Sequence, residues 1–361
     1  MFSSADHACM SQALQLAEKG LFSTTPNPRV GCIIVRDNQI VGRGWHEQAG
    51  QAHAEINALK QAGTAAKNAT LYVTLEPCSH HGRTPPCIDA LIDAGVAKVV
   101  VAMEDPNPLV AGKGCALLRQ AGIEVKVGLM AAEAKALNVG FVCRMLHQRP
   151  WVRLKIAASL DGKTALNNGM SQWITSEAAR RDGHHWRARS CAMLTGIGTV
   201  KADDPQLTVR HVETVRQPLR VVVDSRLEMP LNAKLLKDDS AIIFTAISSK
   251  EKSAALQNLG AKVIEVPGAN GEVDLTKMMR KLAGLEINEV LVEAGSKLNG
   301  ALVQADLVDE LVMYMAPHLL GDKAQGMLDM PELTCLENKS KLDIQDLRMV
   351  GQDIRLIAKF L

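Results

Sequence analysis

His53-Ala54-Glu55 and the later stretch Pro77-Cys78-Ser79-His80-His81-Gly82-Arg83-Thr84-Pro85-Pro86-Cys87 together decide how the first half of the chain is interpreted. One imidazole and two thiolates form a ligand set that suits tetrahedral zinc, and three protein ligands leave the fourth position to water. We therefore expect His53, Cys78 and Cys87 to bind zinc, which lowers the pKa of that water to about 7. Glu55 is near enough to share the site without being a ligand, so we expect it to act as the catalytic acid and base.

Helix-like and strand-like segments alternate around this motif, which predicts a layered α/β domain with helices on both faces of a sheet. Ser4 is the expected N-cap of a first helix, and each zinc ligand is expected near the start of a helix, where the dipole keeps thiolates ionised. The other expected helices begin near His53, run from about Cys87 to Ala94, and pass through Leu117 and Leu118. The expected strands are Val30–Val35 and Ile40–Trp45, joined as a hairpin, then Thr70–Leu75, Val99–Met103 and Val125–Val127.

Length and composition indicate about two domains in a reducing compartment. The chain has 361 residues, against about 150 residues for a typical domain. Its net charge of +2 and its 3% aromatic content argue against a nucleic-acid partner. The N-terminus lacks the pattern of a secretory signal, and the apolar runs are too short to span a bilayer. Eight cysteines without such a signal favour the cytoplasm.

The alternation pauses at Cys143–Pro150 and restarts at Trp151, so we expect one domain over residues 1–147 and a second over 148–361. Strands are expected near Val152–Ala157, Cys191–Thr195, Leu219–Val223, Ile242–Thr245, Lys262–Val266, Glu289–Val292 and Leu311–Met315. Helices are expected near Glu177–Arg189, Lys250–Leu259, Leu275–Ala283 and Leu298–Val303. No motif is evident after Leu320.

The residues alone leave other interpretations open. His53 could be an ordinary surface residue, and the two cysteines could be small core residues. The metal could also be structural, with His80 or His81 as a fourth ligand that closes the site. A deaminase acting on nucleic acid would instead carry a Cys-x-x-Cys pair and a basic or aromatic groove, and the sequence supplies neither.

His-x-Glu followed by Pro-Cys and a second Cys is the signature of zinc nucleobase deaminases, although eight residues separate the cysteines here instead of two. With this insertion the stretch resembles the deaminase half of the bifunctional riboflavin-pathway enzymes. The resemblance covers residues 1–147 and includes Thr25-Pro26-Asn27-Pro28-Arg29-Val30-Gly31, Gly44-Trp45-His46 and Asp105-Pro106-Asn107-Pro108. It implies a cytidine-deaminase-like α/β/α sandwich. It also implies contacts to a phosphoribosylaminopyrimidine substrate from Asn27, His46, His80, Arg83, Asp105 and Asn107.

The second half resembles the reductase half of the same family, from residue 151 to about 320. The matching stretches are Lys155–Lys163, Ser171–Thr175, Gly198–Val200, Asp203–Arg210, Val223–Ser225 and Val292–Gly300. The resemblance implies a dihydrofolate-reductase-like α/β fold and NADPH as the reductant. A Rossmann fold is not indicated, because Gly196-Ile197-Gly198-Thr199 lacks the last glycine of that fingerprint.

The resemblance also assigns residues of the second half to ligands. NADPH is expected to contact Ala157, Trp173, Thr199, Asp203, Ser225, Gly295, Ser296, Lys297, Leu298, Asn299 and Gly300. Substrate is expected to contact Lys155, Ser171, Arg187, Leu207, Arg210 and Glu293. The strand-to-helix turn at residues 293–296 offers free N–H groups to a cofactor phosphate, and the two arginines offer planar forks to the substrate phosphate. Lys155 and Asp203 are the candidates for proton delivery.

Without the resemblance, Trp173 could equally be a core residue, residues 203–205 a turn, and both arginines solvated. With it, the sequence predicts zinc-dependent deamination of 2,5-diamino-6-(5-phosphoribosylamino)pyrimidin-4-one. NADPH-dependent reduction of the ribosyl group of 5-amino-6-(5-phosphoribosylamino)uracil follows. We expect a homo-oligomer, dimer or tetramer, with no nucleic-acid or membrane partner.

Overall fold

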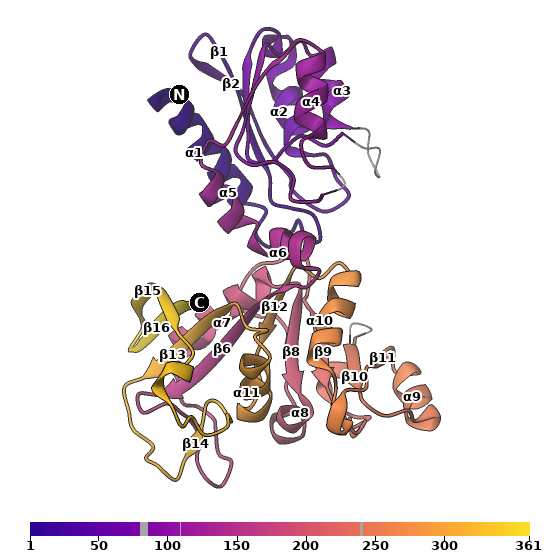
Figure 1. Ribbon diagram of the computed structural model, residues 1–361, viewed down its shortest axis with the longest axis vertical. Coiled ribbons are helices and arrows are strands. Elements are labelled where there is room, and N and C mark those ends of the chain that lie inside the picture. The colour runs from indigo at the N-terminus through magenta and orange to yellow at the C-terminus, as the bar shows by residue number, and fades with distance from the viewer. Residues whose placement is uncertain (80–85, 109, 239–240) are drawn as a thin grey trace. The chain divides into compact units, whose positions relative to one another are not determined.

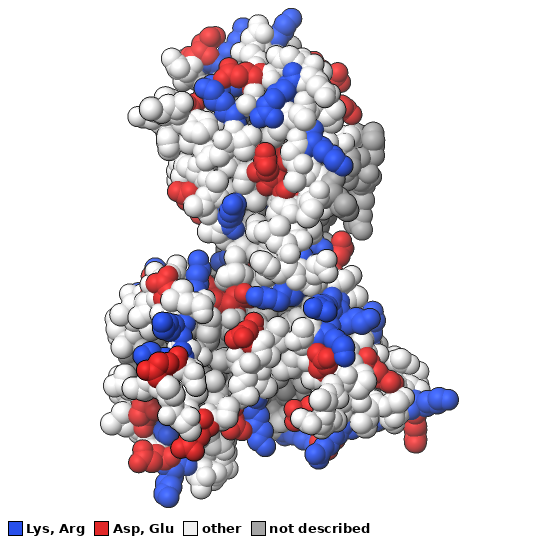
Figure 2. Space-filling view, in the orientation of Figure 1, with Lys and Arg blue, Asp and Glu red and all other residues white. Residues whose placement is uncertain are grey.

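The computed structural model describes residues 1–79, 86–108, 110–238 and 241–361. The chain forms two compact units, Met1–Gln148 and Arg149–Leu361, each built around its own large sheet (Figure 1). Within the described part of the chain, no helix is both long enough and apolar enough to span a membrane. On the face shown in Figure 2, basic and acidic residues are interspersed on both units, in keeping with the small net charge.

The first unit has a five-stranded mixed sheet in the order β2-β1-β3-β4-β5. Its strands are β1 (Gly31–Arg36), β2 (Gln39–Trp45), β3 (Thr70–Val73), β4 (Lys98–Val101) and β5 (Glu124–Val127). The first two form the predicted hairpin, and β1 also pairs with β3 in antiparallel fashion. From β3 to β5 the pairing is parallel, so the carboxyl ends of these strands meet at one edge of the sheet.

Helices cover both faces of this sheet, as predicted. The helices of this unit are α1 (Ser4–Glu18), α2 (Ala54–Ala62), α3 (Cys87–Asp93), α4 (Lys113–Gln120), α5 (Ala131–Leu137) and α6 (Val139–His147), with a 3-10 turn at Gly63–Ala66. Figure 1 shows α1 and α5 on one side of the sheet and α2, α3 and α4 on the other. Glycines allow the close approach, because a Cβ at Gly31 would lie 1.9 Å from the Ala13 carbonyl oxygen of α1 and one at Gly44 2.2 Å from that of Ala54 in α2.

Two local expectations for the first unit were wrong. The N-cap of α1 is Ser3 rather than Ser4, because the Ser3 hydroxyl accepts from the Asp6 N–H while the Asp6 carboxylate accepts from the Ser3 N–H. This reciprocal capping box fixes the helix start one residue earlier. The pause expected at residues 143–150 is also partly helical, because α6 continues to His147.

The second unit has a nine-stranded sheet in the order β11-β10-β9-β8-β12-β6-β13-β16-β15. The strands are β6 (Trp151–Ser159), β8 (Ala192–Gly196), β9 (Leu219–Val223), β10 (Ala241–Thr245), β11 (Lys262–Glu265), β12 (Glu289–Val292), β13 (Glu310–Ala316), β15 (Leu342–Val350) and β16 (Asp353–Phe360). All pairs from β11 to β13 are parallel, whereas β16 pairs with both neighbours in antiparallel fashion. A small separate sheet joins β7 (Lys163–Ala165) to β14 (Gln325–Gly326).

The helices of this unit are α7 (Glu177–Arg189), α8 (Ile197–Asp203), α9 (Lys250–Gln257), α10 (Leu275–Gly284) and α11 (Ser296–Gln304), with 3-10 turns at Lys234–Leu236, Ala269–Gly271 and Leu336–Asn338. Each element predicted for this unit is present, with shifted ends for most. The segment after Leu320, which carried no readable motif, contains the β15–β16 hairpin at one edge of the sheet.

Candidate functional site

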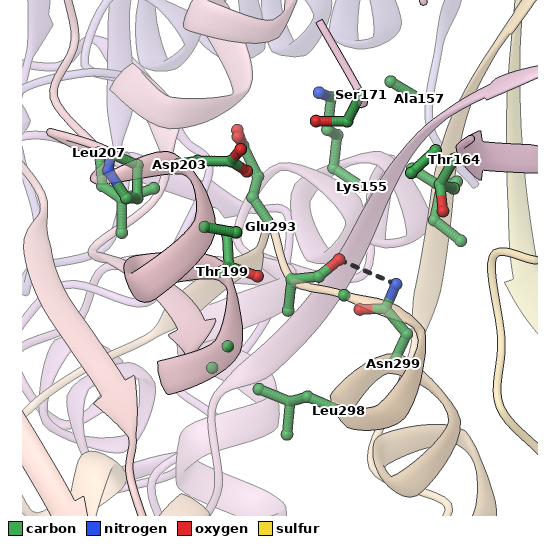
Figure 3. Close-up of a pocket in the computed structure, with 18 of the residues that line it drawn as sticks. Lys155, Ala157, Thr164, Ser171, Thr199, Asp203, Leu207, Glu293, Leu298 and Asn299 are labelled. Atoms are coloured by element: carbon green, nitrogen blue, oxygen red, sulfur yellow. Dashed lines mark hydrogen bonds between the residues drawn. The ribbon is translucent and has the colours of Figure 1, made fainter. Parts of the chain in front are cut away.

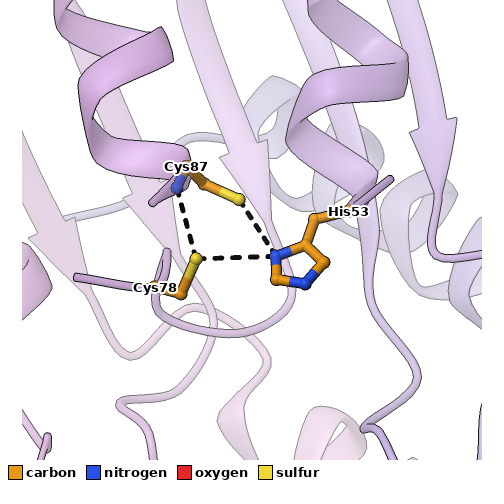
Figure 4. Close-up of side chains that lie close together, drawn as sticks. All are labelled: His53, Cys78 and Cys87. Carbon is orange, nitrogen blue, oxygen red and sulfur yellow. Dashed lines mark hydrogen bonds between the residues drawn. The ribbon is translucent and has the colours of Figure 1, made fainter. Parts of the chain in front are cut away.

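The predicted zinc ligands lie together at the carboxyl end of β3 in the first unit (Figure 4). His53 is the N-cap of α2, Cys87 is the first residue of α3, and Cys78 lies in the loop that follows β3. The Nδ1 atom of His53 is 3.1 Å from the Sγ of Cys87 and 3.5 Å from the Sγ of Cys78. Two ligands therefore sit at helix starts as expected, whereas the expectation is wrong for Cys78.

These distances suit one tetrahedral zinc ion. The three candidate ligand atoms all lie within 4.8 Å of one another. Zinc bonds of about 2.1 Å to nitrogen and about 2.3 Å to sulfur place tetrahedral ligands roughly 3.5–3.8 Å apart. The donor set and its spacing thus fit the metal. His80 and His81, which could close the site as a fourth ligand, lie outside the described residues.

Hydrogen bonds within the cluster prepare one cysteine as a thiolate. The Cys78 sulfur accepts from the backbone N–H of Cys87 at 3.2 Å. The thiol of Cys87 and the His53 ring also face it, and together these groups lower the pKa of Cys78. The pKa of Cys87 rises, since its proton is shared with Cys78 and its side chain is buried. The hydrogen bond to Cys78 likewise raises the pKa of His53.

Glu55 lies in the first turn of α2 and is almost completely buried. Burial raises the pKa of its carboxyl to about 7, with a smaller contribution from the negative charge that develops on Cys78. A carboxyl group that titrates near neutral pH can both accept and donate a proton there. Its position two residues beyond His53 places it next to the ligand cluster, as the sequence predicted.

Asn27 and His46 form a hydrogen-bonded chain beside the cluster. The ring of His46 is 3% exposed and lies edge-on to His53, with centroids 5.4 Å apart. Its Nδ1 lies 3.1 Å from the Ala52 carbonyl oxygen, so Nδ1 must carry the proton. Burial lowers the pKa of His46, so Nε2 accepts from the Asn27 side-chain nitrogen at 3.1 Å. The Asn27 amide therefore offers its oxygen to a ligand, and His46 orients it.

Asp105 and Asn107 follow β4, where the parallel strands end. The Asn107 N–H donates to the Asp105 carboxylate at 2.8 Å, and both residues are half-buried. The two other residues expected to contact this substrate, His80 and Arg83, lie outside the described residues. Glu76, which the sequence analysis did not single out, holds this segment through hydrogen bonds to its backbone. In the sequence, the position of Glu76 directly before Pro77-Cys78 could have indicated that it belongs to the site.

The second unit contains a cavity of about 1030 Å³ at the carboxyl ends of β6, β8, β9 and β12. Ligands of parallel α/β sheets bind at such an edge. The cavity is lined by Lys155, Ala157, Ser171, Trp173, Arg187, Thr199, Asp203, Leu207, Arg210, Ser225, Glu293, Gly295, Ser296, Lys297, Leu298 and Asn299, all of which the sequence analysis singled out. Figure 3 shows Lys155, Asp203 and Glu293 grouped above Leu298 and Asn299.

Gly300 does not line the cavity. It lies on α11, where a Cβ would be only 1.9 Å from the Asp329 carbonyl oxygen. The glycine therefore permits close backbone packing rather than ligand contact. Asn299, next to it, is also tied to the backbone, since its side-chain nitrogen donates to the carbonyl oxygens of Ala294 and Met327 at 3.2 Å each (Figure 3 draws the first).

Lys155, Glu293 and Arg187 form a charged cluster in the cavity wall. Arg187 donates from Nε and Nη2 to the two oxygens of Glu293, at 2.9 and 2.7 Å, and from Nη1 to the Thr208 carbonyl oxygen at 3.0 Å. Burial alone would raise the pKa of Glu293, but the charges of Arg187 and Lys155 lower it to about 2. Burial lowers the pKa of Lys155, and Glu293 partly opposes that shift. We expected the guanidinium of Arg187 to be available to the substrate phosphate, but two of its nitrogen atoms already donate to the Glu293 carboxylate.

Arg210 is exposed at the cavity rim. Its guanidinium lies 3.3 Å from Gln206 Oε1 and 3.2 Å from Thr208 Oγ1, both neutral partners. Its backbone N–H donates to Nδ1 of His184 at 3.2 Å. Burial and the nearby arginines lower the pKa of His184 to about 4, so that ring is neutral at neutral pH. Arg210 thus carries a positive charge at the rim, where both of these side-chain partners are neutral, and it is a candidate contact for an anionic ligand.

Sequence analysis missed His184 and Arg180, although both line the cavity. They lie on one face of α7 with Arg187, because Arg180 and His184 are four residues apart and His184 and Arg187 three. Helical periodicity in the sequence could therefore have identified them. The Arg180 guanidinium lies 4.5 Å from the centre of the Trp173 ring. Trp173 itself is 68% exposed, which excludes the alternative that it is a core residue.

Comparisons with known proteins agree in both halves of the chain. The family model for the cytidine and deoxycytidylate deaminase zinc-binding region matches residues 3–103, and the model for the RibD C-terminal domain matches residues 150–356. The riboflavin biosynthesis protein RibD of Escherichia coli (strain K12) is 48% identical over 365 residues, which cover 97% of this chain and 98% of that protein. The corresponding protein of Aquifex aeolicus (strain VF5) is 43% identical over 99% of both chains.

Solved structures show the same relationship. Acinetobacter baumannii RibD, form 2, has a TM-score of 0.91 at 45% identity over 99% of both chains. A deaminase/reductase from Thermotoga maritima has a TM-score of 0.86 at 32% identity, again over 99% of both chains. The predicted fold class, a cytidine-deaminase-like unit followed by an α/β reductase unit, is confirmed. The chain belongs to the RibD family of riboflavin biosynthesis proteins, which join a deaminase and a reductase in one chain.

Proposed function

We propose that this chain deaminates 2,5-diamino-6-(5-phosphoribosylamino)pyrimidin-4-one and then reduces 5-amino-6-(5-phosphoribosylamino)uracil with NADPH. The T. maritima relative is named a diaminohydroxyphosphoribosylaminopyrimidine deaminase and 5-amino-6-(5-phosphoribosylamino)uracil reductase. One observation carries the proposal: a His53–Cys78–Cys87 cluster beside buried Glu55 occurs in the same chain as a large cavity lined by Lys155 and Glu293. We assign deamination to residues 1–147 and reduction to residues 148–361; the compact units divide one residue later.

In the deaminase, bound zinc supplies a water molecule of lowered pKa. His53, Cys78 and Cys87 would hold the metal, and the hydrogen bonds to Cys78 keep that ligand ionised. Glu55 moves two protons in turn: its carboxylate accepts one from the attacking water and delivers it to a ring nitrogen, then accepts the second and delivers it to the departing ammonia. The Asn27 oxygen, oriented by His46, accepts a hydrogen bond from an N–H group of the pyrimidine.

In the reductase, NADPH supplies the hydride. Lys155 lines the cavity and donates the proton that the ribosyl oxygen takes up as its carbon is reduced. The charge of Glu293 opposes the lowering of the Lys155 pKa by burial, and Arg187 holds Glu293 in place through two hydrogen bonds. The N-terminus of α11, at Gly295 and Ser296, offers backbone N–H groups to a cofactor phosphate.

The direct test is a coupled assay on the purified, zinc-loaded chain. Given the phosphoribosylated diaminopyrimidinone, it should release one ammonia and oxidise one NADPH per substrate consumed. The deaminated intermediate, supplied alone, should support NADPH oxidation without ammonia release. Ammonia release without NADPH oxidation would reject the reductase assignment, and the reverse pattern would reject the deaminase assignment.

Replacing Cys78 with serine should remove most of the bound zinc. A neutral hydroxyl is a poorer zinc ligand than a thiolate, and the site has only two other described ligands. Metal analysis should fall from one zinc per chain to well below half, and ammonia release should fall with it. Cys335→Ser, at an exposed cysteine of the other unit, is the matched control. Full zinc content in Cys78→Ser would show that the ligand assignment is wrong.

Arg210→Ala should raise the KM of the reductase for its phosphorylated substrate about ten- to hundredfold. A charge-assisted contact to phosphate is worth about 1.5–3 kcal/mol, and about 1.4 kcal/mol corresponds to a factor of ten. A dephosphorylated substrate should bind more weakly to the parent and be almost indifferent to the change. Arg181→Ala, on the exposed face of α7, is the control. Equal sensitivity of both substrates to Arg210→Ala would contradict a phosphate contact.

We also propose that the chain assembles with a second copy through β15. Four apolar side chains of β15 are 41–62% exposed: Leu342, Ile344, Leu347 and Met349. Their pairing partners on β16 include Leu356 and Phe360, which pack against the core of the unit, so β15 extends the apolar face of the sheet beyond that core. An exposed apolar edge strand is a typical site for association with another chain. Sedimentation of the parent should give at least a dimer mass, and Leu347→Lys should shift it toward the monomer. A monomeric parent would end this proposal.

The chemistry of the metal site also suits the cytoplasm, as the sequence analysis expected. None of the eight cysteines, all of which lie in the described part of the chain, forms a disulfide, and two of them are proposed metal ligands that must stay reduced. Fractionation of cells that produce the chain should recover both activities with cytoplasmic markers.

A further inference from the structure

Glu76 is a buried carboxylate that no catalytic step described so far uses. It lies just after β3, two residues before Cys78, and is 5% exposed. Its Oε2 accepts from the backbone N–H groups of Asp105 at 3.0 Å and Gly112 at 2.9 Å, and its Oε1 accepts from that of Cys115 at 3.0 Å. One side chain thus satisfies three backbone donors of a distant segment.

Two of those donors belong to the N-terminus of α4. The first N–H groups of a helix have no partner within the helix and are usually satisfied by the side chain of the N-cap residue. Here the N-cap is Gly112, which has no side chain, so Glu76 supplies the oxygens from another part of the chain. The fit is close, because a Cβ at Gly114 would lie 2.3 Å from the Pro77 carbonyl oxygen and 3.1 Å from Glu76 Oε1.

Strand pairing places this contact next to the ligand cluster. The parallel strands β3 and β4 continue to pair beyond their ends, where the Ala102 N–H donates to the Val73 carbonyl oxygen at 2.9 Å and the Glu76 N–H to that of Met103 at 3.0 Å. The segment that follows β4, with Asp105 and Asn107, therefore runs beside the segment that leads to Cys78. The Glu76 carboxylate then ties the two segments together a second time.

We propose that Glu76 is a positioning residue of the deaminase: it fixes the Asp105–Asn107 segment relative to Cys78. The inference rests on the proposed deaminase function, since it assigns that segment to substrate binding. When the tie is broken, the segment leaves its binding-competent position for part of the time. The apparent affinity for substrate then falls in proportion to the competent fraction, while molecules that do bind still react.

Glu76→Gln in the full chain tests this. The change replaces one acceptor oxygen with an NH₂ group that faces backbone donors. We expect the KM for the diaminopyrimidinone to rise about tenfold or more, with kcat within threefold of the parent. Zinc content and NADPH oxidation with the deaminated intermediate should be unchanged. Amide hydrogen exchange over residues 104–116 should accelerate at least tenfold, a readout that needs no activity.

Two further variants sharpen the result. Glu104→Gln changes an exposed carboxylate directly before the Asp105–Asn107 segment and should leave KM and exchange as in the parent. Gly114→Ala keeps the Glu76 carboxylate but presses α4 away from Pro77 and Glu76, and it should raise KM in the same direction. It also serves if Glu76→Gln does not fold. Glu76→Asp keeps the charge and should recover part of the affinity.

Several outcomes would overturn the inference. One is loss of zinc in Glu76→Gln, because Glu76 would then act through Cys78. Another is a lower unfolding temperature with unchanged KM and unchanged exchange, which would make its role purely structural. A parent chain that releases no ammonia would instead reject the proposed function, whereas a normally active parent beside an unchanged Glu76→Gln variant rejects this inference alone.

Discussion

Glu55→Gln should lower the kcat of ammonia release by about three orders of magnitude or more while the chain keeps its zinc. General acid–base groups contribute about 10²–10⁴ each, and this carboxyl group is proposed to act as both base and acid in one turnover. Glutamine preserves the size of the side chain but can neither accept nor release the proton. Burial already raises the pKa of Glu55 to about 7, which is the property that the amide removes.

The design of this experiment separates chemistry from binding and folding. The metal content of Glu55→Gln should match the parent, because the ligands are His53, Cys78 and Cys87. Reduction of the deaminated intermediate should continue at the parent rate, because Lys155 and Glu293 belong to the other unit. Glu47→Gln, an exposed carboxylate that precedes the motif, is the matched control. Ammonia release within tenfold of the parent would show that Glu55 is not the proton carrier.

Sequence reasoning placed the zinc ligands well because their chemistry depends on residue type and order. A histidine and two cysteines in this order and spacing have few other reasons to occur together, and the structure brings their ligand atoms within 4.8 Å of one another. The layered α/β architecture followed from the alternation of apolar patterns in the same way. What these patterns do not encode is which distant side chains pair with each other.

Arg187 and His46 illustrate that limit. Arg187 was expected to grip a phosphate, but its fork is taken by Glu293, a partner 106 positions away that no local pattern reveals. His46 was expected to touch the substrate, yet it is buried, and both ring nitrogens are engaged with Ala52 and Asn27. In both cases the sequence identified a residue of the site, but the partner seen in the structure indicates that it positions a neighbouring side chain.

The β15–β16 hairpin was missed for a different reason. Its first strand carries apolar residues at alternate positions, but the register shifts between Ile344 and Asp346. This bulge places Leu347 on the same face as Ile344 and breaks the two-residue period that marks a strand in sequence. Helices α5 and α6 were missed because they are short and meet at Asn138, which interrupts the helical pattern.

Lys155→Met should lower the kcat of NADPH oxidation by about 10²–10⁴, the range expected for loss of a general acid. Methionine keeps an unbranched apolar chain of similar length, so the cavity wall is preserved while the proton donor is lost. Binding of NADPH, followed by fluorescence, should remain within a few-fold of the parent. Lys201→Met removes an exposed lysine of the same unit that pairs with Glu228, and it should leave kcat unchanged.

The pH dependence gives the sharper test, because its sign follows from the charges around Lys155. A general acid must be protonated, so kcat should fall as pH rises through the pKa of Lys155. Burial lowers that pKa, so the fall should occur below the ordinary lysine value of about 10.4. Glu293 opposes the shift by stabilising the ammonium group, whereas Arg187 lowers the pKa further.

Glu293→Gln should therefore move the alkaline limb of kcat to lower pH. The change removes the carboxylate that favours the charged lysine and leaves the charge of Arg187 without its partner, and both effects lower the pKa of Lys155. A shift of about one pH unit corresponds to about 1.4 kcal/mol of lost interaction. Glu228→Gln, which breaks the exposed pair with Lys201, should leave the limb in place. A limb that stays in place or moves to higher pH in Glu293→Gln would mean that another group donates the proton.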